Sequence, residues 1–146
     1  MKEIRGLVLA VILVVTEFSL LFSVPVQAKQ NLVFVGTVRN NTGHFYRFDG
    51  NSWRNAGEAK WDTCPQNTIL LGHNFQQNGF WLCASPELAN QGTWYFGNVV
   101  NNQGYYWEIS GGKAMAVGDD VKWDTCWSGR MLGRLFNPNG FWICVP

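Results

Sequence analysis

The chain has 146 residues, of which 15% are aromatic and 14% are charged, and its formal net charge is +1 at pH 7. Because a nearly neutral chain without a basic run does not attract phosphates, we expect neither nucleic acid nor an anionic membrane surface as a partner. Eight tryptophans supply enough apolar mass for a core, so length and composition predict a single folded domain.

The N-terminal segment is predicted to be an export signal, residues 1–28. Lys2 and Arg5 give a charged start, Leu7–Val15 is an unbroken apolar run, and Val26–Ala28 ends in a small-residue cleavage pattern. A membrane anchor is the alternative, but the run is much shorter than the roughly 20 apolar residues that a spanning helix needs. We therefore expect a secreted protein, extracellular or periplasmic, with no membrane span after cleavage.

The rest of the chain contains the same sequence pattern twice. Trp61-Asp62-Thr63-Cys64 returns as Trp123-Asp124-Thr125-Cys126, and Asn78–Cys83 returns as Asn139–Cys144. The offset is about 61 residues, a period that indicates a repeated structural unit.

Residues 29–146 are interpreted as one secreted β-domain, with repeat one at 32–84, a link at 85–92 and repeat two at 93–146. Apolar residues alternate or form short runs between Gly, Asn, Pro and Asp, which is typical of strands, and only Glu87–Asn90 in the link suggests a helical turn. The expected strands are Leu32–Val38, His44–Asp49, Ala59–Thr63, Ile69–Phe75 and Phe80–Ala84, then Trp94–Val99, Tyr105–Ser110, Val121–Thr125, Met131–Phe136 and Phe141–Val145.

The predicted fold class is all-β, a pseudo-twofold antiparallel barrel or sandwich of about 8–10 short strands. Each half has one amphipathic sheet, which must bury its apolar face on the other. The stretch Asn40–Gly43 predicts a turn in which Gly43 takes the left-handed conformation, and Asn101–Gly104 predicts the same in the second repeat.

The four cysteines of an exported chain predict two disulfides. The repeat favours Cys64–Cys83 and Cys126–Cys144, since a single ancestral unit would close its own bridge, although pairing between repeats would also satisfy the duplication. Each bridge closes a loop of about 18 residues and contributes about 3 kcal/mol through the unfolded state. No Cys-x-x-Cys spacing suggests zinc, and we expect neither a metal nor another cofactor.

Strand alternation suggests one candidate ligand site in each repeat. Trp81 and Cys83 share a face of their strand, and Asp62 shares a side with Cys64, so the Cys64–Cys83 bridge would gather Asp62 and Trp81. Trp142 and Asp124 would meet in the same way in repeat two. An indole stacks on the apolar face of a sugar ring and a carboxylate binds its hydroxyls. The structural interpretation is favoured over the ligand site, with each Trp packed on a disulfide and each Asp satisfying backbone donors in a turn.

Phe45 and Tyr106 stay aromatic on the polar side of a strand in both repeats. They are candidates for a binding platform or for cross-strand packing, and we favour the packing role. Neither histidine is present in both copies, because His44 corresponds to Tyr105 and His73 to Arg134. With no nucleophile, base and acid in a recognisable arrangement, we expect that the protein is not an enzyme.

The function expected from these features is a secreted, non-catalytic carbohydrate-binding protein with two equivalent sites for an extracellular glycan. The Thr-Cys … Cys plan and the Asn-Asn-x-Gly stretch loosely resemble cyanovirin-type lectins, which also have two tandem repeats, each with its own disulfide. The cysteine spacing is longer here and no full motif matches. The alternative is an inhibitor or immunity-like protein that binds an extracellular enzyme.

Overall fold

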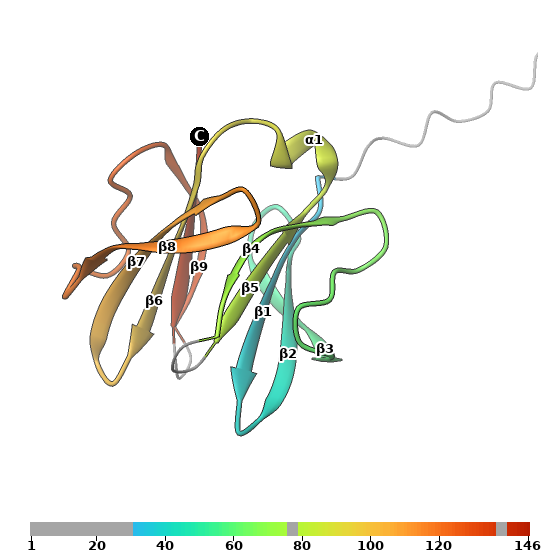
Figure 1. Ribbon diagram of the computed structural model, residues 1–146, viewed down its shortest axis with the longest axis horizontal. Coiled ribbons are helices and arrows are strands. Elements are labelled where there is room, and N and C mark those ends of the chain that lie inside the picture. The colour runs from blue at the N-terminus through green and yellow to red at the C-terminus, as the bar shows by residue number, and fades with distance from the viewer. Residues whose placement is uncertain (1–30, 76–78, 137–139) are drawn as a thin grey trace, which may run out of the picture.

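The fold consists almost entirely of short β-strands (Figure 1). The computed structural model describes residues 31–75, 79–136 and 140–146, so the predicted export signal lies outside the described residues. The elements are β1 Val33–Arg39, β2 Thr42–Phe48, β3 Trp53–Ala59, β4 Ile69–Asn74, β5 Phe80–Ala84, α1 Pro86–Ala89, β6 Trp94–Val100, β7 Gln103–Ser110, β8 Lys113–Asp119, β9 Arg130–Leu135 and β10 Phe141–Val145. The short helix α1 confirms the helical turn expected in the link.

The strands form two antiparallel five-stranded sheets with the same strand order. The first sheet runs β3-β2-β1-β5-β4 and the second runs β8-β7-β6-β10-β9. At one edge the β7–β8 hairpin passes beside β4, where the N–H of Gly112 donates to the carbonyl of Leu71 at 3.1 Å (Figure 1). The predicted all-β fold is therefore confirmed as a sandwich, and the described strands do not close into a barrel.

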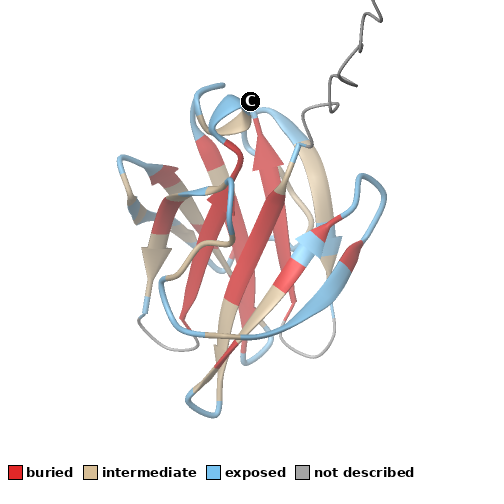
Figure 2. Cartoon of the chain, turned by 90° about the vertical axis from the view of Figure 1, so that its right-hand side faces the viewer, coloured by how far each residue is buried: buried red, intermediate tan, exposed pale blue. Residues whose placement is uncertain are grey.

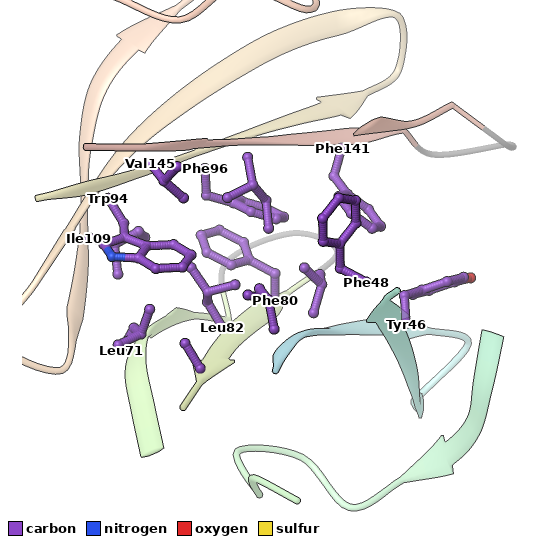
Figure 3. Close-up of a cluster of buried hydrophobic side chains, with 14 of the residues drawn as sticks. Tyr46, Phe48, Leu71, Phe80, Leu82, Trp94, Phe96, Ile109, Phe141 and Val145 are labelled. Carbon is purple, nitrogen blue, oxygen red and sulfur yellow. The ribbon is translucent and has the colours of Figure 1, made fainter. Parts of the chain in front are cut away.

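The core between the sheets is built from aromatic and aliphatic side chains of both halves (Figure 3). Phe80 of β5 stacks on Phe96 of β6 with ring centroids 4.0 Å apart. Tyr46 of β2 meets Phe141 of β10 edge to face at 5.6 Å. Burial of apolar surface contributes about 25 cal/mol per Å², so joining the two apolar faces stabilises both sheets at once.

Successive residues of the central strands point into different clusters. On β5, Phe80 belongs to the core between the sheets, whereas Trp81 belongs to a separate buried cluster on the outer face of its sheet. On β10, Phe141 and Trp142 divide in the same way. The assignment of faces from alternation is thus confirmed for these two strands, which are buried along their whole length (Figure 2).

The third strand of each half lies earlier in the chain than predicted. β3 and β8 end before the repeated Trp-Asp-Thr-Cys stretch, so the strands expected at Ala59–Thr63 and Val121–Thr125 are wrong. Asp62 and Asp124 have φ of 58° and 62°, and a strand cannot continue through this left-handed conformation. The stretch instead belongs to a loop in each half, here called the first crossing loop (residues 60–68) and the second crossing loop (residues 120–129).

The turn between β1 and β2 also differs from the prediction. Asn40 and Asn41 take the left-handed conformation, with φ of 49° and 62°, as a two-residue hairpin turn of type I′ requires. Gly43 lies in β2 instead, where a Cβ would collide with the carbonyl of Ala59 and touch the indole of Trp81. The glycine is therefore needed for close packing rather than for the turn.

Candidate functional site

A disulfide fastens each crossing loop to the central strand of its own half. Cys64 bonds Cys83 and Cys126 bonds Cys144, which confirms the pairing within repeats that the duplication favoured. Cys83 lies on β5 and Cys144 on β10, and both are fully buried. The bridge therefore holds the crossing loop against the outer face of the sheet.

Trp81 and Trp142 lie beneath the crossing loops and are completely buried. The indole N–H of Trp81 donates to the carbonyl of Thr63 at 2.8 Å, and that of Trp142 donates to Thr125 at 2.9 Å. The Trp81 indole also lies directly on Gly36, where any Cβ would overlap the ring. These two side chains support the loops, and neither has a ring face open to a ligand.

Asp62 and Asp124 each lie in a turn, and each contacts a basic side chain through its carboxylate. The left-handed backbone suits Asp, which adopts this conformation more readily than most residues. Asp62 Oδ1 lies 2.6 Å from His73 Nδ1 on β4, and Asp124 forms an ion pair with Arg134 at the matching place on β9. The carboxylates are partly exposed, 37% for Asp62 and 25% for Asp124. Both side chains therefore reach the surface of their crossing loops, although the Oδ1 atom of Asp124 is itself buried.

Phe45 and Tyr106 pack within the outer clusters. Phe45 meets Trp81 edge to face at 5.4 Å. Tyr106 is fully buried and stacks on Tyr95 at 5.3 Å, and its hydroxyl accepts a hydrogen bond from the N–H of Trp127 at 3.2 Å. This burial raises the pKa of the Tyr106 hydroxyl. Both side chains thus pack against aromatic rings of other strands in their own sheet.

The aromatic surface lies one layer further out, on residues that the sequence reasoning did not single out. Trp61 of the first crossing loop stacks on Phe75 with ring centroids 5.8 Å apart and an interplanar angle of 21°. Trp123 and Phe136 form the matching pair at 5.9 Å and 27°. All four side chains are about two-fifths exposed, at 40%, 39%, 40% and 40% respectively. Each half thus presents a fixed pair of nearly parallel rings to solvent.

The buried indoles support these exposed pairs from below. Phe75 lies 6.3 Å from Trp81, and Phe136 lies 6.3 Å from Trp142. A Cβ at Gly43 would approach the Trp61 ring to about 3.1 Å, so the strand surface is shaped to receive it. The exposed rings are therefore held by the fold rather than free to rotate.

A shallow cavity of about 270 Å³ opens beside the first exposed pair. It is lined by Val38, Asn40, Asn41, Trp61, Phe75 and Gly79. Its walls combine two aromatic rings with the amide groups of the β1–β2 turn. A site of this kind offers apolar contact and hydrogen bonding to one small polar ligand.

A signal for these residues is present in the sequence. Trp61 recurs as Trp123 and Phe75 recurs as Phe136, so both pairs are shared by the repeats. A strand through Asp62 would place Trp61 on the face away from the carboxylate, whereas the turn at Asp62 brings Trp61 against Phe75.

No metal cluster of three or more His, Cys, Asp or Glu side chains occurs among residues 31–75, 79–136 and 140–146. The same residues include no helix that is long and apolar enough to cross a membrane. Comparison of the chain with protein-family models, with curated proteins and with solved structures gives no match.

Proposed function

We propose that this chain is a secreted, non-catalytic carbohydrate-binding protein with one site on each half, formed by the pairs Trp61–Phe75 and Trp123–Phe136. The observation that carries the proposal is the exposed, stacked aromatic pair, which occurs in both halves on a support of buried indole and disulfide. A structural role alone does not require large rings to remain exposed in both copies, since exposed apolar surface is unfavourable in water.

The chemistry of each pair suits a pyranose ring. The C–H face of a sugar is apolar and packs on an aromatic ring, while the hydroxyls need donors and acceptors close by. In the first half, Asn40 and Asn41 supply amides at the cavity wall, and the Asp62–His73 pair lies beside Phe75, whose ring is 5.0 Å from the imidazole. Because the rings are already fixed, little conformational entropy is lost when the ligand binds.

The arrangement of the acids supports a binding role rather than hydrolysis. A glycosidase needs two carboxyl groups about 5–9.5 Å apart across one sugar bond. Asp62 and Asp124 belong to the outer sides of different sheets, and packed sheets are themselves about 10 Å apart. The two carboxylates therefore cannot act on one bond. Two disulfides are consistent with secretion.

Binding to polysaccharides and to a glycan array tests the proposal, with Trp61→Ala and Trp123→Ala as the site variants. Each should lower binding by about half at saturation and leave the fold intact, because both side chains are exposed. Trp127→Ala is the matched control, since Trp127 is 54% exposed and belongs to neither pair. Silence of the folded wild-type protein on every glycan, with both disulfides verified, would refute the proposal.

A second candidate function, an inhibitor of an extracellular enzyme, is favoured by one asymmetric feature. Met115, Val117 and Trp127 are exposed by 52%, 37% and 54%, and they lie on or against β8 in the second half alone. Arg54 and Ala56 of β3 stand where the second half has Met115 and Val117. An inhibitor would lose binding to its target on Trp127→Ala and keep it on Trp61→Ala, the reverse of the result expected for a sugar-binding protein.

A further inference from the structure

We propose that the two sites take sugar residues from two different polysaccharide chains at the same time, so that the protein crosslinks them; this inference rests on the proposed function.

The two pairs lie on opposite outer faces of the sandwich. Phe80 and Phe141 point into the shared core, so their neighbours Trp81 and Trp142 point outward on the two far sides. The exposed pairs rest on these indoles through Phe75 and Phe136. With two sheets about 10 Å apart and a crossing loop outside each, the sites are roughly 20 Å or more apart.

The cavity between the two sheets is too small to hold a sugar that would join the two sites. The cavity at the end of the core between the sheets touches both halves, because Val38 and Val99 line it together with Phe80 and Phe141. Its volume is only about 20 Å³, which is room for about one water molecule. A pyranose ring does not fit there, so the two sites are separate binding places.

The sites also cannot move toward each other. Both crossing loops are fixed by disulfides, and the two sheets share one aromatic core. A rigid body with binding sites on opposite faces favours two ligands that approach from opposite directions. One surface cannot contact both sites, so the gain in apparent affinity of about 10²–10⁴ that two linked sites can give requires a ligand on each side of the protein.

Turbidity with soluble polysaccharides tests crosslinking, and dextran, mannan, laminarin and xylan serve as probes. The wild-type protein should precipitate any of these that it binds, most strongly at an intermediate ratio, and excess free monosaccharide should dissolve the precipitate. The single-site variants Trp61→Ala/Phe75→Ala and Trp123→Ala/Phe136→Ala should still bind in calorimetry, with stoichiometry reduced from two to one, and should give no turbidity. Trp127→Ala should precipitate as the wild type does.

The outcomes separate the two proposals. If no probe and no array glycan binds to the folded protein, the proposed function fails and crosslinking fails with it. If a probe binds at two sites but light scattering finds each protein on a single chain, crosslinking fails while sugar binding stands. Precipitation by either single-site variant would also overturn crosslinking by these two sites.

Discussion

The outer faces of the two sheets share one framework but have different surroundings. Both have a buried indole, a disulfide and an exposed Trp–Phe pair. On the first face Asp62 pairs with His73, whereas on the second Asp124 pairs with Arg134 and Trp127 covers Tyr106. Shared residues therefore fix the position of the crossing loop, while the residues that differ alter the charge and cover of its surface.

The presence of a residue in both halves does not by itself show whether its side chain is a buried support or part of the exposed surface. Trp81 and Trp61 are both present in the two halves, yet Trp81 is fully buried and Trp61 is 40% exposed. Substitutions on the two faces can test how closely the frameworks match.

The largest effect is expected from removing a buried indole. Trp81→Ala and Trp142→Ala should each lower the free energy of unfolding by about 3–5 kcal/mol, because each leaves a cavity and an unpartnered loop carbonyl. Urea unfolding followed by tryptophan fluorescence measures the change. Trp61→Ala is the control and should cost much less. Clearly unequal losses at Trp81 and Trp142 would contradict a common framework.

Opening one disulfide should have the next largest effect. The double variants Cys64→Ser/Cys83→Ser and Cys126→Ser/Cys144→Ser should each lose about 3 kcal/mol, since the sequence separations are 19 and 18 and the unfolded-state constraint is nearly the same. Thermal unfolding of the two variants gives the comparison. A loss confined to one half would mean that the other loop is held by different contacts.

Trp127→Ala should destabilise the second half, whereas the matching substitution in the first half should have little effect. The ring lies 4.9 Å from Tyr106, so its removal should cost about 1 kcal/mol of unfolding free energy, whereas Pro65→Ala at the matching position should change little.

The pKa of Tyr106 is raised by burial, so the stability that this residue contributes is full below its usual pKa of 10.0 and falls as pH rises beyond it. In the variant the pKa should move back toward the usual value. Ultraviolet absorbance titration of tyrosinate would show no difference if Trp127 did not cover the ring.

The smallest effect is expected at the hairpin between β2 and β3. The N–H groups of Ser52 and Asn51 donate to Asp49, and with Arg54 they lower its pKa from 3.8 to about 2. The stability from Asp49 is therefore present above about pH 4 and is lost as the pH falls toward 2. Ser110 occupies the matching turn in the second half and cannot titrate in this range.

Asp49→Asn should reduce the acid sensitivity of the melting temperature between pH 5 and 2.5 in a modest but measurable way. The comparison is made by calorimetry at both pH values. An unchanged acid sensitivity in the variant would show that the hairpin does not depend on the ionised carboxylate.

Much of the fold follows from short-range patterns in the sequence. Alternation along β5 and β10 predicts that Trp81 lies on the opposite face from Phe80, and Trp142 on the opposite face from Phe141, because successive strand residues point to opposite sides. The repeat predicts the pairing of the cysteines, since each unit closes its own bridge. Both predictions use information that is local to one strand or one repeat.

The positions of the third strands could not be obtained in this way. Ala59, Trp61 and Thr63 alternate with charged residues as they would in a strand, but the backbone at Asp62 is left-handed, with φ of 58°. Once the stretch becomes a loop, Trp61 turns to meet Phe75, a contact across 14 positions of the chain. Such contacts depend on the position that the crossing loop takes on the sheet.

The sequence by itself determined an all-β chain of two similar halves, the residues of the central strands that share a face, and the disulfides that the duplication favoured. These follow from alternation, turn residues and repetition, which act over short distances. Only the tertiary structure decided that Trp81 and Trp142 are buried supports, and that Trp61–Phe75 and Trp123–Phe136 are the exposed pairs. Exposure depends on what packs above a residue, and here that cover comes from a loop whose path is set by the complete sandwich.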